Sequence, residues 1–85
     1  MNDKTRHIRE RFPDKCPIID LLMAEDPEFV ALSEDYDTCV NALRYWAQSN
    51  APESESRVIE YHTLIKGLEE EISQFLAAAK PRRLD

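Results

Sequence analysis

Glycine and cysteine are scarce in this 85-residue chain, which contains one glycine and two cysteines. Phosphate-binding loops need several glycines at fixed spacing, so the sequence excludes the common nucleotide-binding motifs. Cys16 and Cys39 do not form a C-x-x-C pair, and neither His7 nor His62 supplies a metal-ligand spacing. No serine stands beside a base pattern typical of a nucleophile. We therefore expect no metal, no cofactor, free thiols and no enzymatic activity.

Long apolar runs are also missing from the sequence. The longest apolar cluster covers residues 18–24 and is interrupted by Asp20, so no segment is suited to span a membrane. The basic residues near the N-terminus are not followed by the apolar stretch of a secretory signal. We therefore expect a cytoplasmic protein.

Positive charge is scarce in the body of the chain. Residues 16–79 contain three basic and thirteen acidic side chains, within a net charge of −6 for the whole sequence. Basic residues exceed acidic ones only in residues 1–15 and 80–85. An acidic body argues against a nucleic-acid groove along it. The basic ends leave open a contact with an anionic partner, for which Arg82 and Arg83 are candidate residues.

Apolar residues recur at steps of three and four in two stretches, which is the heptad spacing of paired helices. The first stretch begins at Phe29 and ends at Trp46, and the second begins at Val58 and ends at Ala79. If the numbers of facing residues add up to 104, six layers pair between them: Trp46–Val58, Leu43–Tyr61, Cys39–Ile65, Tyr36–Leu68, Leu32–Ile72 and Phe29–Phe75. The sequence therefore predicts an all-α fold built on an antiparallel, coiled-coil-like hairpin.

Capping residues and prolines predict the bounds of the two long helices. Asp26 is a suitable N-cap and Pro27 fits a first helical turn, so the first long helix should cover residues 27–49. A turn at residues 50–53 offers Asn50 and Glu53 as a capping box, with Ser54 as a rival cap. The second long helix should cover residues 54–79.

Three shorter segments complete this single domain of residues 1–85. Residues 17–25 form a short apolar helix that Pro17 begins, and residues 80–85 form a basic tail. Residues 1–16 form a basic arm, for which the sequence leaves open a short helix capped by Asp3 or a frayed end.

Two helices alone bury too little apolar surface for a chain of this length. Apolar residues beside the heptad stripes therefore need cover. The short N-terminal helix could cover one edge, or a second copy could complete a four-helix bundle, and the sequence favours neither alternative. The candidate partner contacts are Ile18, Leu22, Val40, Leu64 and Leu76.

A short motif in the first half of the hairpin resembles a known family. The chain resembles the YdcH-type small helical proteins of bacteria, whose function is uncharacterised and whose first long helix opens with Asn/Asp-Pro-x-Phe-x-x-Leu. The resemblance covers residues 18–76 and rests on Ile19, Leu22, Asp26, Pro27, Phe29, Leu32 and Tyr36. It implies a helical hairpin and brings no catalytic residues. The basic arm and Trp46 depart from the family pattern.

The sequence thus indicates a small interaction or assembly module, a hairpin that packs against itself or against a partner protein. The alternative is an accessory factor that binds nucleic acid, anionic lipid or an acidic protein through its basic ends.

Overall fold

The structure is a computed structural model that describes residues 5–79, and the regular structure in this range is entirely helical. The all-α prediction is confirmed for the described residues. The elements in chain order are helix α1 (Arg6–Arg11), the 3-10 helix η1 (Pro13–Lys15), and helices α2 (Cys16–Glu25), α3 (Pro27–Ala47) and α4 (Ser54–Ala78).

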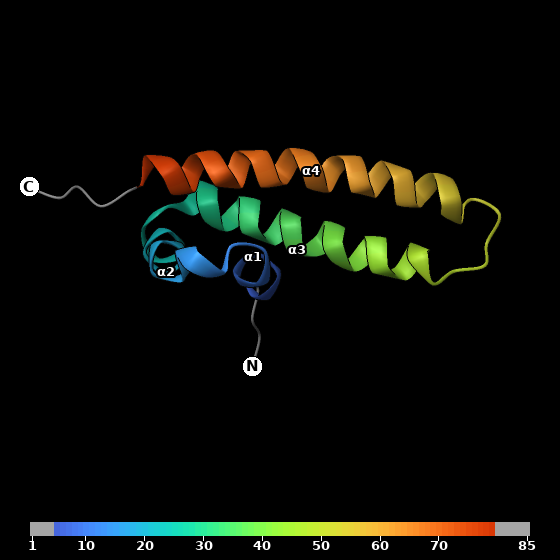
Figure 1. The fold of residues 1–85 in the computed structure, drawn as a ribbon, viewed down its shortest axis with the longest axis horizontal. Coiled ribbons are helices and arrows are strands. Elements are labelled where there is room, and N and C mark those ends of the chain that lie inside the picture. Colours follow the sequence, from blue (N-terminus) through green and yellow to red (C-terminus); the bar gives the residue numbers. More distant parts are fainter. Residues whose placement is uncertain (1–4, 80–85) are drawn as a thin grey trace, which may run out of the picture.

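The two long helices lie side by side and antiparallel, joined by the turn at residues 48–53 (Figure 1). Helices α1 and α2 pack on one side of α3, toward the open end of the pair, where α3 begins and α4 ends. The molecule measures 56 × 27 × 21 Å, and its radius of gyration is 14.6 Å. A compact domain of this length has a radius of gyration of about 12 Å. The turn end of the hairpin therefore projects beyond the N-terminal helices.

The start of α3 follows the capping prediction. The Asp26 carboxylate accepts hydrogen bonds from the backbone N–H groups of Glu28 (3.0 Å) and Phe29 (3.3 Å), and Pro27 lies in the first turn. These bonds satisfy two donors that the helix cannot pair internally, which stabilises the helix by about 1 kcal/mol. The prediction of an Asp26 cap is confirmed. Pro17 likewise lies in the first turn of α2.

The start of α4 differs from the predicted capping box. Glu53 is the N-cap, and no side chain makes a capping hydrogen bond there. The Ser54 hydroxyl instead donates to the Ala51 carbonyl (2.9 Å), and the Ser49 hydroxyl accepts from the Ala51 N–H (3.1 Å). The prediction of side-chain caps at Asn50 and Ser54 is wrong, because the hydroxyls near the turn bond to its own backbone instead.

The basic arm contains a docked helix. A helix of six residues is unstable by itself in water, so α1 depends on its contacts. Ile8 supplies the main contact, since its side chain is fully buried against the hairpin. Thr5 occupies the N-cap position, and the predicted cap Asp3 lies outside the described residues. Of the two alternatives for the arm, residues 6–11 adopt the helix.

One apolar core joins helices α1 and α2 to the open end of the hairpin. Phe29 of α3 meets Phe75 of α4 edge to face, with ring centroids 5.8 Å apart, in a layer that the register of 104 pairs. The buried members of the core are Ile8, Ile19, Leu22, Phe29, Leu32, Tyr36, Ile72 and Leu76. The core thus draws on α1, α2 and the half of the hairpin beside them.

Candidate partner-binding surface

The structure divides the candidate contact residues between core and surface. Leu22 and Leu76 are buried within the chain, with exposed fractions of 8% and 2%. Ile18 and Val40 are half-buried and pack against the same core. Leu22 and Leu76 are therefore covered by the chain itself, whereas Ile18 and Val40 are partly covered. Among the candidates in the described residues, Leu64 alone is exposed, at 53%, while Arg82 and Arg83 lie outside the described range.

The N-terminal helices cover one edge of the hairpin at its open end. His7 of α1 reaches α3, where its Nε2 lies 3.3 Å from Asn41 Oδ1 and 3.5 Å from Asp37 Oδ1. Ile8 beside it and Leu76 of α4 are buried, and Val40 packs against the same core while staying half-buried. Helices α1 and α2 thus both pack against α3 at this end.

The arginines of the arm are engaged in ion pairs within the chain. Arg6 pairs with Glu10 (3.5 Å), Arg9 with Asp20, and Arg11 with Glu69 (3.3 Å). Each guanidinium is thereby offset by a nearby carboxylate. The described part of the arm consequently presents little unpaired positive charge to an anionic partner, and the basic tail lies outside the described residues.

The turn end of the hairpin has no enclosed core. No residue from 37 to 71 falls in the buried class, although this range contains seven residues of the predicted seam. The seam side chains in this range are all half-buried: Cys39, Leu43, Trp46, Val58, Tyr61, Ile65 and Leu68. Two helices can shield only the sides that face each other, and helix α1 contacts this part at its inner end, through His7 at Asp37 and Asn41 and through Arg11 at Glu69. We call residues 38–66 the distal half of the hairpin.

The distal half also carries most of the large exposed apolar side chains. Tyr45 is 64% exposed, Ile59 63% and Leu64 53%, and the fourth such residue among the described ones is Leu21 of α2, at 46%. Ile59 lies on one side of α4 and Leu64 on another, and single exposed apolar residues of this kind are common on protein surfaces, whereas contiguous apolar patches mark interaction sites.

Charge is balanced in the distal half and strongly negative in the stretches of α2, α3 and α4 that flank it. Residues 16–37 contain seven carboxylates and no cation, and residues 67–79 contain three carboxylates and no cation. The distal half contains as many cations as carboxylates: Arg44, Arg57 and Lys66 against Glu53, Glu55 and Glu60. An acidic partner would meet less repulsion on the distal half than on these two flanking stretches.

Aromatic side chains gather near the turn. The rings of Tyr45 and Trp46 meet edge to face with centroids 5.1 Å apart. The Arg57 guanidinium lies 5.9 Å from the centre of the Trp46 ring and 3.0 Å from the Glu60 carboxylate. Trp and Arg are enriched among the residues that contribute most to protein interfaces. Here they are already engaged with each other.

One side of α4 carries a stripe that runs from the distal half into the covered half. Residues 55, 59, 62 and 66 follow at steps of four, three and four, so Glu55, Ile59, His62 and Lys66 share one side of the helix. The same side continues through Glu69 and on to Leu76, where Arg11 and the core cover it. All four distal members are exposed. We call these four residues the distal stripe.

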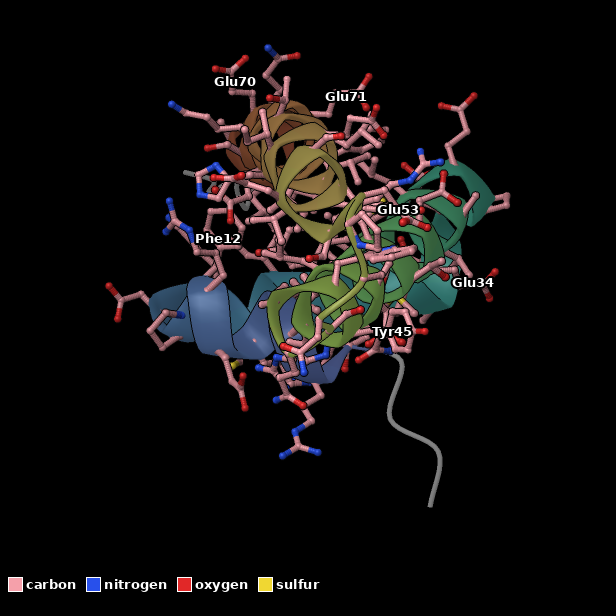
Figure 2. All side chains as sticks on the ribbon, turned by 90° about the vertical axis from the view of Figure 1, so that its right-hand side faces the viewer. Phe12, Glu34, Tyr45, Glu53, Glu70 and Glu71 are labelled. Atoms are coloured by element: carbon pink, nitrogen blue, oxygen red, sulfur yellow. The ribbon has the colours of Figure 1, made fainter. Side chains whose placement is uncertain are left out.

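A shallow groove of about 260 Å³ lies where the distal stripe meets the N-terminal segment. Viewed along the hairpin from its turn end, Phe12 points toward α4, and Glu70 lies on the same side (Figure 2). Tyr45, Glu34 and Glu71 lie on the opposite side. The groove is lined by Arg11, Phe12, Lys66, Glu69, Glu70 and Ser73.

A polar contact fixes the inner edge of the groove. The Tyr36 hydroxyl donates a hydrogen bond to Glu69 Oε2 (2.8 Å), the same oxygen that lies 3.3 Å from Arg11 Nε. Burial raises the pKa of Tyr36, and the hydrogen bond and charge of Glu69 raise it further. The phenol therefore stays protonated and links α3 to α4, while Arg11 links the arm to the same carboxylate.

Cys39 does not carry the features of a reactive cysteine. Cys16 and Cys39 are both free and half-buried. Burial raises the pKa of Cys39, and the negative charge of Asp35 raises it further. A raised pKa lowers the thiolate fraction, which is the nucleophilic form. Cys39 accordingly acts as a small apolar residue of the seam.

The sequence interpretation missed the distal stripe and the groove. The stripe has a detectable signal, since its steps of four, three and four form a second heptad series beside the seam of α4. No sequence pattern predicts the position of Phe12 against α4, because this position depends on how the arm folds back onto the hairpin.

Within residues 5–79 no helix combines the length and the apolarity that a bilayer crossing requires. The same part of the chain holds no group of three or more His, Cys, Asp or Glu side chains placed to bind a metal ion. No protein-family model, no curated protein and no solved structure matches this chain.

Proposed function

We propose that this protein is a small protein–protein interaction module and that it binds its partner through the distal half of the hairpin. One observation supports this most: no residue between 37 and 71 is buried, although the heptad seam continues through that range. A seam that stays half-open leaves apolar area in water, and each square ångström that a partner covers contributes about 25 cal/mol.

The division of the molecule supports an adaptor-like role. The open end has its own core and its own cover, which makes it a rigid base. The distal half extends from this base with Tyr45, Ile59 and Leu64 exposed. A helical partner that laid an apolar stripe along it would turn two helices into a bundle. Kinship to the YdcH-type proteins rests on the sequence motif and stays a prediction.

Site-specific photo-cross-linking in the native cell tests this proposal. A photoreactive amino acid replaces Ile59 or Leu64 in the distal half, and the matched control replaces Leu21 of α2, an exposed leucine of similar accessibility. We expect protein adducts at position 59, position 64 or both, and none at position 21. Adducts at position 21 alone, or no adduct at any position, would contradict the proposal.

A further inference from the structure

We infer that the partner of the distal half is a second copy of this chain, which pairs its distal stripe antiparallel with the distal stripe of the first copy. This inference rests on the proposed interaction function and names the partner and the register.

Net charge restricts where two copies can meet. Two chains with a net charge of −6 repel each other, and the repulsion is strongest at the acidic open ends. The distal half has equal numbers of cations and carboxylates, so contact there adds no net repulsion. Overlap of the distal halves in opposite directions places the two acidic open ends at opposite ends of the assembly, separated by far more than the Debye length of about 8 Å.

The order of charges along the stripe suits an antiparallel copy. Glu55 lies at the turn end of the stripe and Lys66 at its inner end, about 16 Å away along the helix. If facing residues add up to 121, Glu55 of each copy faces Lys66 of the other, and Ile59 faces His62. A two-fold axis repeats each contact. Parallel stripes would instead place Lys66 against Lys66 and Glu55 against Glu55.

Both charges are available for this pairing. Glu55 and Lys66 are exposed, and neither forms an ion pair with another residue in the range 5–79. Charges that flank an apolar helix contact typically set the direction and the identity of the partner helix. Ile59, at 63% exposed, supplies the apolar centre of the stripe.

In this register, the turn of the second copy lies beside the groove. Residues 50–53 of that copy fall at the level of residues 68–71, where Glu69 and Glu70 line the groove together with Phe12. The turn presents Ala51 and Pro52, small apolar residues that suit the Phe12 ring. The cover that α1 and η1 give to the open end would thus continue into cover by the second copy.

The opposite edge is less suited to a second copy. Leu64 lies there with Glu60 one turn before it and Glu71 two turns after it. Glu34, Glu53 and Glu71 all lie on this side in the view along the hairpin (Figure 2). Arg57, the cation of this edge in the distal half, is already paired with Glu60. Two copies joined by this edge would bring carboxylates together.

Variants with exchanged charges, measured by sedimentation equilibrium on the full chain, test the inference. We expect the wild type to form a reversible dimer in the micromolar range, because a contact this short belongs to the small class of interfaces. Lys66→Glu alone and Glu55→Lys alone should each weaken dimerisation about tenfold, since two attractive pairs become repulsive. The double variant with both exchanges restores opposite charges and should recover wild-type dimerisation.

Two further variants test which side of α4 is used. Ile59→Glu should weaken the dimer at least about tenfold, and the matched control Leu64→Glu, which adds the same charge to the same helix, should leave it unchanged. Circular dichroism of every variant verifies that the helices remain, which both exposed positions should permit.

Several results would overturn the inference. One is a wild type that stays monomeric at every concentration. Another is a double variant that dimerises no better than the single variants. The third is a dimer that Leu64→Glu weakens and Ile59→Glu does not. A monomeric wild type combined with cross-links from position 59 to a different protein would exclude the second copy and leave the proposed function standing. A monomeric wild type without any cross-link would exclude the second copy as partner and the proposed interaction function as well.

Discussion

Alanine substitutions at Phe29 and Leu43 compare two layers of the same helical seam. Both side chains lie on α3 at positions of the predicted seam, but Phe29 is fully buried, whereas Leu43 is half-buried in the distal half. If the stability of the chain comes from the open end, equivalent truncations should have very different costs.

The expected costs follow from burial. Phe29→Ala removes a fully enclosed ring and its edge-to-face contact with Phe75, which costs about 3 to 5 kcal/mol. Leu43→Ala removes a side chain that water already reaches and leaves no closed cavity, so its cost should be about 1 to 2 kcal/mol. A chain of 85 residues has a free energy of unfolding of about 4 to 13 kcal/mol. Phe29→Ala should therefore remove much of the total.

Urea unfolding followed by circular dichroism measures both losses. The experiment uses low protein concentration, so that association between copies does not add to the free energy of unfolding. A difference of at least about 2 kcal/mol between the two variants supports the division into a stable base and an open distal half. Equal losses, or a larger loss for Leu43→Ala, would refute it.

Three further predictions concern single residues. Tyr36→Phe should lower the free energy of unfolding by about 1 kcal/mol at neutral pH. Because the pKa of Tyr36 is raised in the folded chain, its stabilising effect is complete below the ordinary tyrosine pKa of 10.0 and is lost as the pH rises further. Urea titrations at pH values on either side of that pKa should therefore show a smaller alkaline loss in Tyr36→Phe than in the wild type, and equal losses would contradict this. Gly67→Ala should raise the free energy of unfolding by about 0.5 to 1 kcal/mol, since an added Cβ would meet no atom within 4 Å, and thermal melting that shows no gain would count against it. Ile8→Ala should cost about 2 to 4 kcal/mol of docking and expose α1, so trypsin should cut after Arg11 faster than in the wild type, and an unchanged cleavage rate would mean that the arm is not held by Ile8.

Local signals in the sequence were sufficient to predict the two long helices and the residue at which α3 begins. The steps of three and four residues fix which side of each long helix is apolar, and Asp26-Pro27 fixes the first turn of α3 through bonds between neighbouring residues. α3 ends at Ala47, two residues before the predicted end, and α4 ends at Ala78, one residue before it. Helix ends fray, so such differences are expected.

Contacts between residues far apart in the chain could not be predicted from the sequence. The arm becomes helical because Ile8 and His7 find α3, a contact between residues 34 positions apart in the case of His7 and Asn41. Because α1 and α2 pack on one edge of the hairpin, Leu22 and Leu76 become core residues and Leu64 stays exposed. Helical periodicity treats both edges alike, which is why it could not assign these three leucines.

Chemical shifts of the backbone amides in a dilution series test most directly whether a second copy covers the distal half. NMR spectra of the wild-type chain are recorded from high to low concentration, without any substitution. Concentration-dependent shifts should be confined to the distal stripe from Glu55 to Lys66 and to the groove residues around Phe12, while Ile72 in the core and Leu21 on α2 stay constant. Spectra that do not change on dilution, or shifts centred on Leu21, would contradict the account.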